Sequence, residues 1–177
     1  INDFINLGGL SVLSNSPDSY TQLTWLKFDD FSDSRIIGTK RNSSGGWATP
    51  YAKDTALMFY ADDAGYTGAN IGYTTSIDTG NYYFLCFVKD FSSYSIYLNG
   101  VLVDSMYDTH SISPTSSDYY IGAHSAWNKY MKGTIDCFGL WNRALNSSEI
   151  EQIYSASCPT TENTQAQVDT TICFGET

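Results

Sequence analysis

The sequence predicts an all-β fold in which two antiparallel sheets pack as a sandwich, with one short helix near the C-terminus. Aromatic residues make up 15% of the 177 residues and charged residues only 16%, a composition that favours strands over helices. Short apolar runs recur along the chain with turn residues between them, a spacing typical of sandwiches. A helix is predicted only for residues 146–156. The length suits one domain with its own core and a short tail.

The predicted strands are short runs rich in β-branched and aromatic residues. They cover residues 3–8, 19–28, 34–40, 55–62, 69–77, 81–90, 94–105, 118–123 and 133–141. Residues 81–90 are apolar almost throughout, which predicts a strand covered on both faces. Asn99-Gly100 separates two apolar runs and predicts a type I′ hairpin turn. Residues 41–54 hold two Gly and a Pro and are expected to form a loop.

The predicted helix has a clear start signal. Asn146 is a good N-cap residue, and Glu149 follows three residues later, as in a capping box. Apolar residues at helical spacing, from Ile150 to Tyr154, give the helix one side that can dock onto the sandwich. Arg143 is expected to pair with a carboxylate or a carbonyl near the helix start.

The chain is expected to divide near residue 157. Residues 1–157 form the domain, and residues 158–177 are predicted to be a linker followed by the first strand of another β repeat. The linker prediction depends on a polar stretch, residues 159–171, that has almost no large apolar side chain. The sequence begins at Ile1 without the pattern of a signal peptide, so we expect a mature piece or an excerpt.

The chain has four cysteines, and whether they form disulfides indicates the cellular compartment of the protein. Cys158 and Cys173 flank the polar stretch, where a disulfide would order the tail and imply export. Cys86 and Cys137 lie in apolar strand-like runs and are read either as two buried thiols or as a bridge between strands. No Cys-x-x-Cys motif is present and the chain has only two His, so no structural zinc site is expected.

The charge balance excludes two classes of partner. The formal net charge is −10 and the chain has nine basic residues without a basic run. Nucleic-acid binding needs clustered Lys and Arg, and so does an anionic membrane surface. No apolar run approaches the roughly 18 residues that span a bilayer. We therefore expect neither nucleic-acid binding nor membrane insertion.

Several segments together resemble a known family. The closing segment "GTIDCFGLWNRALNSSEI" (133–150), preceded by "SIYLNG" (95–100) and "YYIGA" (119–123), is similar to the laminin-G-like and pentraxin-like branch of the concanavalin-A-like jelly rolls. The resemblance covers about residues 2 to 155 and implies a jelly-roll sandwich, lectin-like function and an extracellular or cell-surface location. The tail resembles junctions in very large surface adhesins of Bacteroidota-type bacteria.

The sequence also departs from this family. The family has a further strand before the position of Ile1, so upstream residues or another protein chain would complete that sheet edge, or the edge is exposed. Cys137 and Gly139 stand where the family more often has charged residues, which predicts that something covers them.

Catalytic residues are not apparent. Glycan-cleaving relatives of this shape carry a Glu-x-Asp-x-Glu run, which places carboxylates on one face of a strand. Such a run is missing from the sequence. The adjacent pairs Asp29-Asp30 and Asp62-Asp63 would point to opposite faces. The sequence therefore predicts a protein that is not an enzyme, and a glycan-cleaving enzyme is the weakest alternative.

Calcium is an open cofactor prediction. Asp54 falls where the resemblance puts the first calcium ligand, but Thr55 replaces the expected amide and residues 123–133 contain no Asp or Glu. Calcium needs six to eight oxygen ligands, so a double site is not expected. Asp54 is either a single ligand or a turn residue, and one weaker site with Asp62 or Asp63 stays open.

Carbohydrate binding is the predicted function. Aromatic rings stack on the C–H faces of sugars, and planar polar side chains bind the hydroxyls. Segments 41–54 and 123–130 carry such residues and are expected on one side of the sandwich. The predicted site consists of Arg41, Trp47, Tyr51, His124, Trp127 and Asn128. Trp25 and Trp141 lie in strands and are expected to be structural.

Two alternatives stay open at this point. A loop Trp such as Trp47 or Trp127 can fold back onto its own domain instead of binding a ligand. The chain can also be a structural spacer or a protein–protein interaction module of a multidomain surface protein. The predicted partner is a glycan or polysaccharide, and a second protein chain that completes the sheet edge is the alternative.

Overall fold

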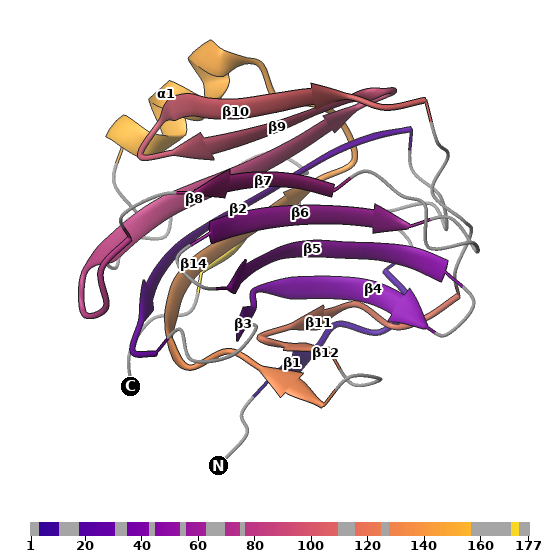
Figure 1. Ribbon diagram of the computed structural model, residues 1–177, viewed down its shortest axis with the longest axis vertical. Helices are drawn as coiled ribbons and strands as arrows, with labels where there is room; N and C mark the ends of the chain where they lie inside the picture. Colours follow the sequence, from indigo (N-terminus) through magenta and orange to yellow (C-terminus); the bar gives the residue numbers. More distant parts are fainter. Residues whose placement is uncertain are drawn as a thin grey trace.

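The computed structural model shows a two-layered β-sandwich with a helix on one outer face (Figure 1). It describes residues 4–10, 18–30, 35–42, 45–53, 56–62, 70–74, 77–109, 116–124, 128–156 and 171–173. For residues 35, 36, 41, 42, 45–53, 58–62, 70–74 and 171–173 it describes the backbone alone. The predicted all-β sandwich with one C-terminal helix is confirmed.

Within these ranges, the first sheet contains seven antiparallel strands in the order β1-β11-β4-β5-β6-β7, with β3 paired to β5. They are β1 (Ile5–Asn6), β3 (Arg35–Ile36), β4 (Gly38–Asn42), β5 (Gly45–Lys53), β6 (Ala56–Asp62), β7 (Asn70–Thr74) and β11 (Tyr120–Ile121). The predicted loop over residues 41–54 is therefore wrong. Glycines read as loop signals begin β5 instead, because Gly45 and Gly46 pair with Asn42 and Arg41 in a tight β4–β5 hairpin.

The second sheet contains six described strands in the order β10-β9-β8-β2-β14-β15. They are β2 (Ser19–Phe28), β8 (Tyr82–Asp90), β9 (Ser93–Leu98), β10 (Val101–Tyr107), β14 (Gly133–Trp141) and β15 (Thr171–Cys173). A two-stranded hairpin, β12 (Ala123–His124) and β13 (Lys129–Tyr130), continues from the first sheet. The Gly122 N–H donates to the Ile37 carbonyl (2.9 Å) and fixes this hairpin beside β4.

The main core lies between the two sheets. Leu26, Phe28 and Phe87 from one sheet and Leu57 and Ile121 from the other are at most 2% exposed. Strand β8 is buried on both faces, as its apolar run predicts, because its alternate residues contact a second cluster under the helix. The apolar sequence of β8 therefore reflects its position between two cores.

The helix α1 (Ser147–Ser155) covers the outer face of the six-stranded sheet. Ile150 is fully buried there, and the Tyr154 ring stacks on Trp25, with ring centroids 5.7 Å apart. Trp141 is 8% exposed in the same cluster. The prediction that Trp25 and Trp141 are structural is confirmed.

The start of helix α1 is fixed by polar contacts that the sequence predicts. The Asn146 side chain accepts from the Glu149 N–H (3.0 Å), and the Glu149 carboxylate accepts from the Asn146 N–H (2.8 Å), which completes the capping box. Arg143 donates to both Glu149 oxygens, at 2.8 and 3.0 Å. The predicted pairing of Arg143 near the helix start is confirmed.

The outer neighbour of β14 is the short last strand. β15 pairs antiparallel with β14 over Cys137–Gly139, so residues 171–173, predicted to begin another repeat, lie in this domain's own sheet. The face of Gly139 is covered by the Trp141 ring, since a Cβ on Gly139 would lie 2.4 Å from that ring. The domain boundary at residue 157 stays a prediction.

Cys86 is a buried free thiol, and burial raises its pKa far above the ordinary value. The alternative of a Cys86–Cys137 bridge is therefore wrong. Cys86 lies on the helix side of β8 and packs in the second cluster as a small apolar residue.

Candidate functional site

Three aromatic side chains meet at the β1 edge of the seven-stranded sheet. The Phe4 ring lies 5.8 Å from the Tyr120 ring in an edge-to-face arrangement and 6.4 Å from the Tyr130 ring, centroid to centroid. We call Phe4, Tyr120 and Tyr130 the edge cluster. Phe4 is 49% exposed, so a large apolar ring faces water at this edge.

The strand pairing explains why these residues meet. β1 pairs with β11 so that Ile5 lies opposite Ile121 and Asn6 opposite Tyr120. Ile121 is buried in the core, so the alternation turns Tyr120 to the outer face. Phe4 is two residues from Asn6 and therefore lies on the same outer side.

A buried lysine fixes the segments beneath the cluster. Lys40 lies on β4 and is fully buried, and its Nζ donates to the carbonyls of Gly9 (3.2 Å) and Ser117 (3.0 Å). Desolvation by burial lowers its pKa, while Asp118 opposes that shift. The cation joins the segment after β1 to the segment before β11, which sets the position of both.

Planar polar groups surround the rings. The Asn6 amide donates to Asp118 (2.9 Å), and the Tyr130 hydroxyl donates to the Asn128 Oδ1 atom (3.0 Å). Asn128 has φ of +52°, a left-handed turn conformation that Asn tolerates. Asn6 and Asn128 are both exposed. Amide and carboxylate groups thus lie next to exposed aromatic carbon.

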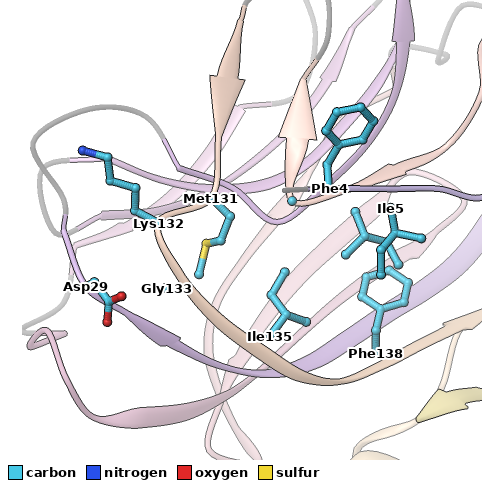
Figure 2. Close-up of a pocket in the computed structure, with 10 residues that line it drawn as sticks. Phe4, Ile5, Asp29, Met131, Lys132, Gly133, Ile135 and Phe138 are labelled. Carbon is cyan, nitrogen blue, oxygen red and sulfur yellow. The ribbon is translucent and has the colours of Figure 1, made fainter. Parts of the chain in front are cut away.

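A pocket of about 450 Å³ has Phe4 among its lining residues (Figure 2). Its walls come from both sheets and are mostly apolar. They are formed by Phe4, Ile5, Ile121, Gly122, Met131, Gly133, Ile135 and Phe138, with Asp29 and Lys132 also lining it. Lys132 also pairs with Asp30 (3.0 Å). The lining thus includes Ile5 of β1 and both Gly133 and Ile135 of β14.

This arrangement suits a ligand with flat apolar patches and many hydroxyls. Rings that already lie edge to face offer a preformed stacking surface. The neighbouring amides and carboxylate can accept and donate hydrogen bonds without a large rearrangement. Sugars have both features.

The structure describes only part of the predicted site. Asn128 lies beside the edge cluster. His124, on β12, is only 1% exposed, so its imidazole does not face solvent as a surface sugar contact would. Trp127 and Asp54 lie outside the described residues, as does Cys158.

The positions of Arg41, Trp47 and Tyr51 are known from the backbone. Trp47 lies opposite Lys40 and Ala61, and Tyr51 lies opposite Ile36 and Met58. Ala61 is four residues from the core residue Leu57 on β6, so both lie on the core face of the sheet. Met58 is adjacent to Leu57 and therefore lies on the opposite face. A register shift between Ala48 and Tyr51 produces this change of face. Positions 47 and 51 therefore lie on opposite faces of the sheet.

Sequence reasoning missed Phe4 and Tyr120. A usable signal was present in "DYYIGA", because two consecutive Tyr in a strand must face opposite sides. Tyr119 is fully buried, which leaves Tyr120 for the outer face. The approach of Phe4 depends on a strand pairing across more than a hundred residues, which no local pattern indicates.

Two further findings concern the described part of the chain. It contains no group of three or more His, Cys, Asp or Glu side chains placed to hold a metal ion. None of its helices is long and apolar enough to cross a membrane.

The two packed sheets form an antiparallel β-sandwich. A family model described as the concanavalin A-like lectin/glucanases superfamily matches residues 2–151, and the chain belongs to that superfamily. The predicted family resemblance is confirmed. No curated protein matches this chain significantly.

Solved structures with the same fold include binding domains. The botulinum neurotoxin serotype G binding domain matches with a TM-score of 0.66 and 16% identity over 89% of this chain and 40% of that chain. Domain 4 of AbnA, an extracellular arabinanase from Geobacillus stearothermophilus in complex with arabinotriose, matches with a TM-score of 0.69 and 19% identity over 84% of this chain and 71% of that one.

A third structure concerns botulinum neurotoxin type C, whose cell entry depends on interaction with two ganglioside molecules. It matches with a TM-score of 0.63 and 13% identity over 80% of this chain and 36% of that chain. The chain thus spans about two fifths of the toxin chains. At these identities the likeness shows the fold.

Proposed function

We propose that this chain is a non-catalytic carbohydrate-binding module that holds a glycan or polysaccharide on the edge cluster. The exposed Phe4 ring carries the proposal. It contacts two tyrosine rings and lies beside the exposed amides of Asn6 and Asn128. Exposure of half of such a ring to water is unfavourable, and a bound sugar face would remove that cost.

The structural neighbours support this choice. The arabinanase domain was solved with arabinotriose, and the cell entry of a toxin that contains this fold depends on gangliosides, which supports a carbohydrate as the ligand. Those neighbours are mostly binding domains, which supports a module without catalysis. We place the module outside the cell or on its surface, and the screen described below tests calcium, for which Asp54 is the candidate ligand.

A protein-interaction module is the second candidate. Among the described strands, β14 is paired on its outer edge only over Cys137–Gly139, and the residues from Gly133 to Asp136 have no described outer partner. A partner strand could add there by main-chain hydrogen bonds. This candidate predicts protein binding that survives loss of the Phe4 ring.

A binding screen with matched variants tests the proposal. The probes are soluble arabinan, xylan, mannan, β-glucan and sialylated oligosaccharides, each with added calcium and with chelator. We expect at least one to bind, and Phe4→Ala to weaken binding about tenfold, because ~1.4 kcal/mol of lost apolar contact is tenfold in Kd.

The control is Tyr107→Ala. Tyr107 is 73% exposed on β10, at the opposite edge of the six-stranded sheet from β14. Its loss should leave glycan affinity unchanged. Equal affinity of the Phe4→Ala variant and the wild type for the bound glycan would contradict the proposed site.

A further inference from the structure

Two of the cysteines differ in whether their sulfur is bonded. Cys86 is a free thiol buried under the helix, whereas the sulfur of Cys137 is disulfide-bonded. Since Cys86 is free, the partner of Cys137 within the chain is Cys158 or Cys173. Of these two, the structure describes the strand position of Cys173.

The last strand places one of them directly opposite Cys137. In the β14–β15 pair, Cys137 faces Cys173, Phe138 faces Ile172 and Gly139 faces Thr171. Directly opposed residues of antiparallel strands have Cα atoms about 4.5 to 5.5 Å apart, inside the roughly 4.4 to 6.8 Å that a disulfide spans. Directly opposed positions of two antiparallel strands also belong to the same face of a sheet.

We infer that Cys137 and Cys173 form a disulfide that fastens β15 to the outer edge of β14. This assignment replaces the Cys158–Cys173 pairing that the sequence favours and leaves Cys158 a thiol. It is independent of the proposed glycan site, because no residue of the edge cluster takes part in it.

The bond forms by thiol–disulfide exchange with an oxidised dithiol donor, such as a disulfide-carrying oxidoreductase. Each cysteine thiol loses one proton and one electron, the new S–S bond forms, and the donor disulfide is reduced to two thiols. Such donors operate in export compartments, which agrees with the proposed extracellular location.

The cross-link has a clear structural consequence. A ladder of three residues is too short to hold a terminal strand firmly, so the covalent bond keeps β15 in place. It also closes a loop that contains Trp141, the Arg143–Glu149 pair and helix α1. Reduction of the disulfide would release β15 and extend the unpaired edge of β14. Whether β15 covers that edge therefore depends on the redox state of the two cysteines.

Peptide mapping of the oxidised protein decides the pairing. The protein is alkylated under denaturing conditions without reductant, digested and analysed by mass spectrometry. We expect a cross-linked peptide pair containing Cys137 and Cys173, with Cys86 and Cys158 alkylated. A Cys137–Cys158 cross-link, or alkylated Cys137 in protein purified from an oxidising compartment, would overturn the assignment.

Matched variants test the consequence. In Cys173→Ser, hydrogen exchange in residues 171–173 should rise at least tenfold over the oxidised wild type, and reductant should have no further effect. Cys158→Ser should behave as the wild type. Loss of protection in Cys158→Ser alone would contradict the proposal. If Cys173→Ser does not fold, the same exchange measured on wild type with and without dithiothreitol gives the answer.

Discussion

The ring of Tyr154 on helix α1 lies directly over Gly100 in the β9–β10 turn. A Cβ added to Gly100 would lie 2.7 Å from the Cδ1 atom of that ring, and Gly100 has φ of +78°. Asn99 precedes it with φ of +51°, as a type I′ turn requires, and its Oδ1 atom accepts from the Phe84 N–H (3.0 Å). The turn is therefore held by a hydrogen bond to β8 and by packing against helix α1.

Substitution of Gly100 should lower the stability of the fold by more than its positive φ alone explains. Gly100→Ala is expected to lower the free energy of unfolding by ~2–3 kcal/mol, from positive φ plus overpacking against Tyr154. Gly80 has φ of +84° with nothing within 4 Å of an added Cβ, so Gly80→Ala should cost only ~1 kcal/mol. Urea denaturation measures both, and equal losses would contradict the contact.

The helix cap gives a second prediction. Asn146→Ala should destabilise the protein by ~1 kcal/mol, because the Glu149 N–H loses its acceptor. Asn146→Asp keeps an acceptor and should stay within about 0.5 kcal/mol of the wild type. Thermal unfolding compares the three proteins. A loss in the Asp variant as large as in the Ala variant would show that the cap does not act through this hydrogen bond.

The Arg143–Glu149 pair predicts a pH dependence. Hydrogen bonds from Arg143, and then from the Asn146 N–H, hold the pKa of Glu149 below its ordinary value of 4.5. A lowered carboxyl pKa stabilises the fold above pH 4.5, and this contribution is lost as the pH falls through the lower folded value. The difference in urea midpoint between wild type and Glu149→Gln should therefore shrink at acidic pH.

Gln at this position retains the capping geometry, so that variant isolates the charge. Urea midpoints are measured in steps from neutral pH downward. A difference that stays constant through the acidic range would show that Glu149 titrates as it does in the unfolded chain.

Local sequence patterns predicted the elements whose cause is local. The Asn99-Gly100 turn, the Asn146 cap and the doubly covered strand β8 each depend on neighbouring residues or on their own apolar run. The strand pair β4–β5 was missed because the residues that allow a tight hairpin, Gly45 and Gly46, also signal a loop.

The site was harder to predict because its parts are far apart in the chain. Phe4 meets Tyr120 only through the β1–β11 pairing. His124 looked like an exposed loop residue, but β12 packs beside β4 and buries it. A bulge in β5 between Ala48 and Tyr51 places positions 47 and 51 on opposite faces of the sheet, and such a register shift has no signature in the sequence.

The most direct test of the proposed function is a map of ligand contact on the folded protein. An NMR titration of the isotope-labelled chain, with the glycan that binds most tightly in the screen, reports which residues change environment. The edge cluster predicts the largest shift changes at Phe4, Tyr120, Asn128 and Tyr130, with little change at Tyr107 or on helix α1. Changes centred on α1 or β10, with the edge cluster unaffected, would contradict the account.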